Sequence, residues 1–123
     1  VTEIENHKMS LLPYFPLASG LLTGKYKKDK YFPENSRFLA WPQLVDKYMS
    51  DENWIKIKSL ENFCDKYNLK LLDISFRWLA SKKYVSSIIA GATSAQQVEQ
   101  NVNSLKCNLS ENQLKEISRI ISN

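Results

Sequence analysis

Apolar residues recur at two different spacings along the chain, and the alternation of these spacings predicts the order of its elements. Residues 9–15 and 85–90 are short apolar runs that favour extended backbone, so we expect each to form a strand. Residues at about 53–68 carry an apolar stripe at helical spacing, and residues 71–82 are apolar almost all round, which predicts two helices. Because strands alternate with helices and no hairpin signal occurs, the strands are expected to pair in parallel.

Polar residues at the starts of the helices supply the expected caps. Asp51 or Asn53 is expected to cap the first helix, and Ser94, with Gln97 three residues later, is expected to begin another that runs to about residue 105. The S-E-N-Q of residues 110–113 is a capping box that opens the last helix.

Other stretches lack a clear period. Residues 17–26 contain Gly20 and Gly24, which let the backbone bend closely around a neighbour or a ligand. Residues 27–52 are polar and aperiodic, so we expect a long loop that has room for a short helical turn. Residues 1–8 resemble the end of a helix.

Length limits the chain to one domain, and the two predicted strands indicate that this domain is incomplete. The 123 residues are one domain at most, with the 43% hydrophobic and 24% charged content of an ordinary globular protein. Two parallel strands alone leave unpaired edges and an uncovered face. We therefore expect residues 1–123 to form a single incomplete domain, and the first residue, Val rather than Met, suggests a chain that begins inside something longer.

Several kinds of chemistry are disfavoured by the residues present. Cys64 and Cys107 lie far apart and are expected to be reduced core residues, not a disulfide or a metal pair, so no metal site is predicted. The single histidine, His7, lies on a polar terminal segment, and no nucleophile elbow occurs, which argues against a Ser-His-Asp site.

The charge pattern and the lengths of the apolar runs bear on whether the chain binds nucleic acid or a membrane. A net charge of +4 is mild, and its one concentration, Lys25 to Lys30, is typical of a solvated loop, so nucleic acid is not an expected partner. No apolar run is long enough for a membrane span and no signal peptide is recognised, so we expect a cytoplasmic protein without a membrane partner.

The junction from residue 85 to residue 101 is a candidate anion site. It leads from a predicted strand through Gly91 and the hydroxyls of Thr93 and Ser94 into a helix N-terminus. Unpaired N–H groups and the positive end of the helix dipole favour an anion there, such as a phosphate. The same residues would also serve simply to turn the chain and cap the helix, since every α/β protein has such junctions.

Two long motifs carry a family resemblance. L-P-Y-F-P-L-A-S-G-L-L-T-G-K-Y at 12–26 and I-I-A-G-A-T-S-A-Q-Q-V-E-Q-N at 88–101, with F-R-W-L at 76–79 and L-S-E-N-Q-L at 109–114, resemble the aldo-keto reductase superfamily. The resembling branch includes the potassium-channel β subunits and many bacterial reductases. It implies an α/β fold, a TIM-type (β/α)8 barrel, of which this chain holds the C-terminal portion: about the last two strand-helix units and a terminal helix.

The resemblance implies NADP(H) as cofactor, with NADPH preferred over NADH. It places the ring of Tyr14 against the nicotinamide, and Lys25 and Arg37 near phosphate groups. The residues that would wrap the pyrophosphate are Phe15, Pro16, Leu17, Ala18 and Ser19.

The second motif would hold the adenosine half of the cofactor. Likeness to the family places Gly91, Thr93 and Gln97 near the ribose and its 2′-phosphate, and Gln100 and Asn101 near the adenine.

The chain departs from the family pattern in two respects. The residue after Tyr14 is usually Ser, but here it is Phe15, which removes one hydroxyl from the pyrophosphate site. The catalytic Asp, Tyr, Lys and His of the family come from earlier strands, and no residue here matches them.

We therefore expect the cofactor-binding C-terminal part of an NADPH-dependent oxidoreductase that transfers hydride to aldehydes or ketones, with the isolated chain inactive. The alternative is a non-catalytic binding module, or a truncated product, that associates with another chain or with itself through open strand edges.

Overall fold

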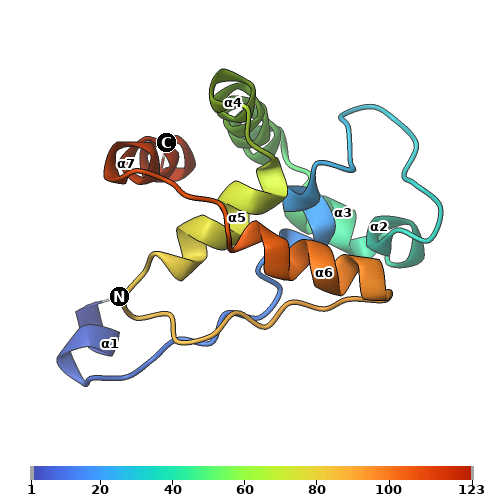
Figure 1. The fold of residues 1–123 in the computed structure, drawn as a ribbon. Coiled ribbons are helices and arrows are strands. Elements are labelled where there is room, and N and C mark those ends of the chain that lie inside the picture. Colours follow the sequence, from blue (N-terminus) through green and yellow to red (C-terminus); the bar gives the residue numbers. More distant parts are fainter. Residues whose placement is uncertain (1, 123) are drawn as a thin grey trace.

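The computed structural model describes residues 2–122, and most of its regular structure is helical (Figure 1). Its elements in chain order are α1 (Thr2–Asn6), a 3-10 segment η1 (Ala18–Thr23), α2 (Arg37–Ala40), α3 (Gln43–Tyr48), α4 (Asp51–Tyr67), α5 (Leu71–Ala80), α6 (Ala95–Ser104) and α7 (Glu111–Ser122).

The two predicted strands run side by side, but they do not form a continuous ladder. Isolated parallel bridges join Leu11 to Val85 and Tyr14 to Ile89, and these bridges are the strand pairing among residues 2–122. The predicted parallel direction is confirmed, whereas the predicted length of the strands is wrong. Pro13 has no N–H to donate and contributes only its carbonyl, which accepts from the Ile89 amide at 3.1 Å.

The four long helices appear where the sequence predicted them. The expected caps of α4, Asp51 or Asn53, are wrong, because Ser50 is the N-cap and its Oγ accepts from the Asn53 amide at 3.2 Å. The box at α7 is reciprocal: the Ser110 amide donates to Gln113 Oε1 at 2.8 Å, and the Gln113 amide donates to Ser110 Oγ at 3.3 Å.

Residues 27–52 hold more structure than the sequence predicted, since two short helices, α2 and α3, form there. Ser36 caps α2 and Phe38 is fully buried. Burial of Phe38 in the core therefore stabilises this segment. A single buried side chain produces no helical period in the sequence, so the pattern could not predict α2.

The core lies between η1, α2, α4, α5 and α7. α5 packs against α6 and η1, and α4 packs against α7. The buried apolar side chains that form this cluster are Leu21, Tyr26, Phe38, Ile57, Leu60, Phe63, Cys64, Leu71, Ile74 and Ile117.

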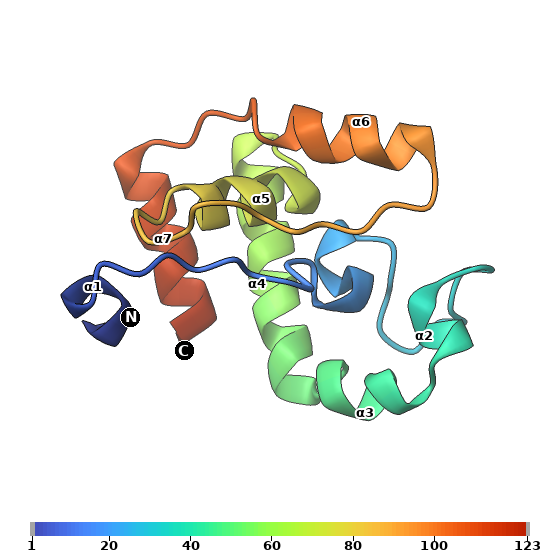
Figure 2. The same cartoon turned by 90° about the horizontal axis from the view of Figure 1, so that it is seen from below.

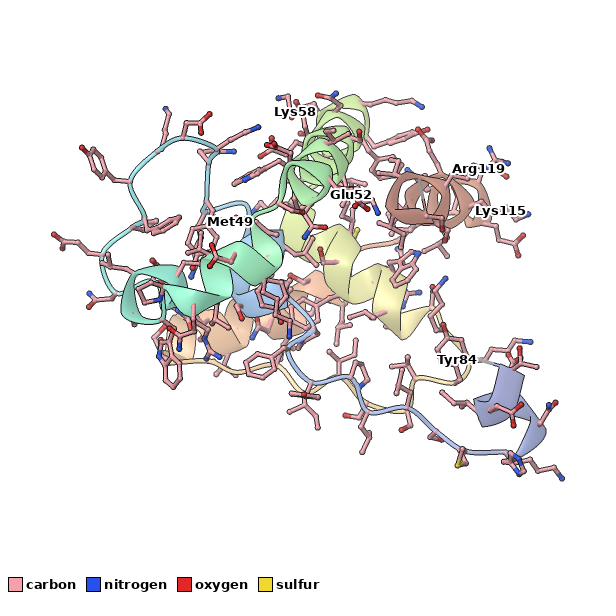
Figure 3. All side chains as sticks on the ribbon, turned by 180° about the vertical axis from the view of Figure 1, so that it is seen from behind. Met49, Glu52, Lys58, Tyr84, Lys115 and Arg119 are labelled. Carbon is pink, nitrogen blue, oxygen red and sulfur yellow. The ribbon has the colours of Figure 1, made fainter. Side chains whose placement is uncertain are left out.

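The helices from α4 to α7 lie on one side of the extended pair, and the other side is open (Figures 1 and 2). Figure 3 draws side chains of both segments projecting from the uncovered side, with Tyr84 at the start of the second segment. Leu12 is 53% exposed and Ile89 is 55% exposed. Apolar surface of this kind is normally covered in a finished sheet.

Candidate cofactor site

The parallel bridges bring the ends of the two extended segments together. Tyr14 pairs with Ile89, so the loops that follow these residues leave from the same end of the pair. The N-terminus of α6 and the short helix α2 also lie toward that end in both views (Figures 1 and 2). The rim formed by residues 14–25, 37 and 91–101 is the candidate site.

The first loop of the rim has an unusual backbone. Phe15, Ala18 and Ser19 have φ values of 55°, 46° and 58°, and Gly20 follows at 98°. Left-handed conformations are uncommon for residues with a Cβ, and their clustering is typical of functional loops. Local backbone hydrogen bonds hold the loop in this form, and in one of them the Ala18 amide donates to the Phe15 carbonyl at 3.0 Å.

Ser19 contributes an orphaned polar atom to this loop. The residue is only 7% exposed, and its Oγ has no hydrogen-bond partner among residues 2–122. An unmet buried hydroxyl costs about 1–3 kcal/mol, so such groups are expected where a ligand or water completes the bonding. The hydroxyl fits a ligand that carries oxygen acceptors.

Lys25 lies folded over the same loop. A Cβ added at Gly20 would approach Lys25 Cε to 2.9 Å, and Lys25 Nζ lies 5.0 Å from the centroid of the Tyr26 ring. No carboxylate within the described residues 2–122 pairs with Lys25. The ammonium therefore keeps its charge available beside the left-handed loop.

Arg37 and the aromatic residues that end the first segment form a row. The rings of Tyr14 and Phe15 have centroids 5.1 Å apart, and Arg37 Cζ lies 5.3 Å from the Phe15 centroid. Tyr14 is 72% exposed, so its ring is open to a planar ligand.

Two other lysines of the basic cluster, Lys27 and Lys28, form ion pairs. Lys27 Nζ lies 2.6 Å from Glu61 Oε1, and Lys28 Nζ lies 2.6 Å from Asp51 Oδ1. The hydrogen bond from Lys28 lowers the pKa of Asp51 below its usual value. These pairs place acidic side chains beside two of the charges in the basic run.

At the second loop, Thr93 and Gln97 form a closed unit. Gln97 Oε1 accepts from the Thr93 amide at 2.8 Å and lies 3.2 Å from Thr93 Oγ1, while the Gln97 amide donates to Ser94 Oγ at 3.3 Å. The expected Ser94 cap is confirmed. The Gln97 side chain, however, reaches back to Thr93 with its Oε1, which leaves the two N–H donors of its Nε2 for other partners.

The backbone at Gly91 has an ordinary conformation. Its φ lies outside the left-handed region, and a Cβ there would meet no atom within 4 Å. The turn therefore does not require glycine at this position, and the space beside it is open.

The two predicted adenine-side residues, which are neighbours on α6, have different surroundings. Gln100 is exposed, and its backbone carbonyl oxygen lies 2.9 Å from Ser104 Oγ. Asn101 lines an open groove of about 500 Å³ between α5, α6 and residues 85–92, whose other walls are mostly apolar. Within residues 2–122 no hydrogen bond or ion pair links the first loop to residues 91–101.

Sequence reasoning missed the residue that supports both cationic side chains. Tyr26 is 2% exposed, its OH accepts from the Phe38 amide at 3.4 Å, and its ring lies 4.5 Å from that of Phe38. It therefore joins the loop that carries Lys25 to the helix that carries Arg37. The only signal in the sequence was an aromatic residue at the end of the first motif.

Residues 2–122 contain no group of three or more histidine, cysteine or acidic side chains placed to hold a metal ion. In the same part of the chain, no helix has the length and apolarity needed to cross a membrane.

Parallel pairing of two extended segments joined through helices is the arrangement of an α/β protein. Comparison with known proteins then identifies the group: the model of the Aldo/keto reductase family matches residues 2–122, and the chain belongs to that family.

The chain matches only a part of each of the curated relatives described here. A probable voltage-gated potassium channel subunit beta from Arabidopsis thaliana is 36% identical over 99 residues, which are 79% of this chain and 30% of that protein. An NADH-specific methylglyoxal reductase from Escherichia coli (strain K12) is 32% identical over 103 residues, 80% of this chain and 29% of that protein. The chain thus spans less than a third of the length of these relatives.

A solved structure shows the same partial match. A glycerol dehydrogenase from Gluconobacter oxydans superposes with a TM-score of 0.70 at 24% identity, covering 97% of this chain and 36% of that one. This likeness concerns the fold alone, and it matches the chain to part of a (β/α)8 barrel.

Proposed function

We propose that residues 1–123 are a barrel segment that binds NADP(H) for an aldo/keto reductase. The observation that carries the proposal is the pairing of Tyr14 with Ile89, because it sets two cofactor-type loops at one rim. The orphaned Ser19 hydroxyl and the uncommitted charge of Lys25 support a phosphate-bearing ligand there.

In this proposal the chain binds and orients the cofactor. Tyr14 offers its exposed ring to the nicotinamide, the backbone of residues 15–19 encloses the pyrophosphate, and Lys25 and Arg37 supply positive charge. The adenosine half lies against residues 91–101. NADPH, when bound, supplies a hydride to an aldehyde or ketone.

The preference for NADPH over NADH rests on the donors available for a 2′-phosphate. Arg37 has no carboxylate partner within residues 2–122, and the amide N–H₂ of Gln97 is not used by Thr93. One relative is named as NADH-specific, so cofactor preference within the family needs a direct measurement.

The chain supplies no proton donor for the reaction. None of its residues matches the family's catalytic Asp, Tyr, Lys and His, so we expect the isolated chain to be catalytically inactive, in a cytoplasmic setting with small carbonyl substrates for the complete enzyme.

Titration of NADPH into the purified chain, followed by tryptophan fluorescence, tests the proposal. Trp41, 57% exposed just after α2, is a suitable reporter. We expect weak, saturable binding that Thr93→Ala reduces about fivefold through one lost hydrogen bond. Thr2→Ala, at an exposed position on α1, is the matched control. A flat titration would contradict the proposal, and aldehyde reduction by this chain would contradict its inactivity.

The exposed apolar side chains favour a second function, association with another chain. Met9, Leu12 and Ile89 are each more than half exposed, and they lie on segments whose outer edges pair with no other segment of residues 2–122. Sedimentation of the isolated chain separates the two: concentration-dependent association supports the binding module, and a monomer with a cooperative melt argues against it.

A further inference from the structure

The row formed by Tyr14, Phe15 and Arg37 has a feature that the proposed cofactor binding alone does not explain. Phe15 is 49% exposed. The centroid of its ring lies 5.3 Å from Arg37 Cζ and 5.1 Å from the centroid of the Tyr14 ring. An exposed aromatic ring in a left-handed residue carries a conformational cost without burying its surface. The conformation of Phe15 therefore indicates that its contact with Arg37 has a function.

Both ends of the Phe15–Arg37 contact are fixed by the fold. The Phe15 carbonyl accepts from the Ala18 amide at 3.0 Å, which closes the turn that sets the ring's direction. Arg37 lies between Ser36, 3% exposed, and Phe38, fully buried. The two side chains are thus exposed while their backbones are anchored, so the contact is preorganised.

Stacking on a ring leaves the guanidinium able to bind an anion. A guanidinium that packs by its face keeps its five N–H donors in the plane, where they match phosphate oxygens. A carboxylate partner would occupy those donors, and no carboxylate within residues 2–122 pairs with Arg37.

We propose that Phe15 is a positioning residue that holds the Arg37 guanidinium beside the loop of residues 15–20, so that phosphate binding at this rim depends on the stack. The ligand class is a phosphate-bearing dinucleotide, and to that extent this inference rests on the proposed function. The ring takes over, through Arg37, the contribution that a hydroxyl at position 15 would make directly.

The test compares Phe15→Leu, which removes the π face but keeps an apolar side chain, with Phe15→Tyr, which keeps the face. NADPH is the probe, and its binding is followed by ¹⁵N-HSQC titration of the 123-residue chain. Phe15→Leu is expected to weaken binding about two- to fivefold, the range of an exposed cation–π contact, and Phe15→Tyr to leave it nearly unchanged. In the Arg37→Ala background, Phe15→Leu is expected to have no further effect.

A second readout follows the stack without ligand. The Arg37 Hε and Hδ resonances should be shifted upfield by the ring in the parent chain and in Phe15→Tyr, and should return to ordinary values in Phe15→Leu. Thermal unfolding should not move, because the ring lies outside the core.

The outcomes separate this inference from the proposed function. Absence of NADPH binding by the parent chain contradicts the proposed function and the role of the stack with it. Binding that ignores Phe15→Leu, a loss of equal size in Phe15→Tyr, or a full Phe15→Leu loss in the Arg37→Ala background overturns the positioning role while leaving the proposed function intact.

Discussion

Ser104 on α6 and Asp73 on α5 are joined by a hydrogen bond of 2.8 Å between Oγ and Oδ1. Ser104 is 1% exposed, and its hydroxyl also lies 2.9 Å from the Gln100 carbonyl. This hydrogen bond holds α6, whose N-terminal end lies beside Thr93 and includes Gln97, against α5. The position of half of the candidate site therefore depends on a contact outside that site.

Replacing Ser104 with alanine is expected to destabilise the chain by about 1–3 kcal/mol, because the Asp73 carboxylate loses its donor at a nearly dry contact. Urea unfolding followed by circular dichroism measures the change. Ser10→Ala, at an exposed serine without a side-chain hydrogen bond among residues 2–122, should stay within about 0.5 kcal/mol of the parent. Equal stability of the two variants would show that the contact contributes nothing.

A second prediction concerns stability in acid and the Glu116 clip, the contacts of Glu116 on α7 with Lys66 and Tyr67 on α4. Glu116 Oε1 lies 3.2 Å from Lys66 Nζ, and Glu116 Oε2 lies 3.0 Å from the Tyr67 OH. The hydrogen bond from Lys66, aided by that from Tyr67, lowers the pKa of Glu116 below its ordinary value of 4.5. A carboxylate with a lowered folded pKa contributes stability above the unfolded pKa and loses it as the pH falls through the folded pKa.

Urea midpoints measured from pH 6 down to acid should therefore fall more steeply for the parent chain than for Glu116→Gln, which cannot titrate there. Because the groups are exposed, added salt should reduce the difference. Parallel pH profiles would show that the clip is not linked to proton binding.

Much of the fold was predictable because its signals are local. The Ser110 to Gln113 box and the Ser94 cap depend on residues three apart, and both are present. α2 was not predicted, because its anchor is the contact of Phe38 with Tyr26, twelve residues away, and a helix of four residues carries no period. The strands were predicted too long because a strand needs neighbours on its edges, and the sequence pattern does not say which neighbours are present.

The candidate site divides in the same way. The motifs indicated which residues belong to the two loops, and the Tyr14 to Ile89 bridge sets these loops at one end of the pair. The left-handed backbone at Phe15 and Ser19 was not predictable, because neither residue type favours that region. The closure of Gln97 onto Thr93 shows how a capping signal fixes a helix start while leaving open which amide the side chain accepts from.

The two cysteines should differ in reactivity. Burial raises the pKa of the Cys64 thiol to about 12, and burial also raises the pKa of Cys107, which lies nearer the surface. A thiol reagent such as DTNB at pH 8 should modify Cys107 slowly and Cys64 only after unfolding in urea. Cys107→Ser should therefore abolish the reaction in native buffer. A fast native reaction that survives in Cys107→Ser would contradict the buried position of Cys64.

Gly20 and Gly91 offer a matched pair for testing the first loop. Gly20 has a φ of 98°, and a Cβ there would lie 2.9 Å from Lys25 Cε, whereas a Cβ at Gly91 would meet nothing within 4 Å. Gly20→Ala should cost about 1–2 kcal/mol for the left-handed backbone and should also push the Lys25 side chain away from the loop. Gly91→Ala should be neutral or slightly stabilising, since it only restricts the unfolded chain. Chemical denaturation gives the stabilities of both variants, and NADPH titration of Gly20→Ala beside the parent chain reads the displacement of Lys25. If phosphate binding uses that ammonium, Gly20→Ala binds NADPH more weakly than the parent chain, and unchanged affinity would remove Lys25 from the site.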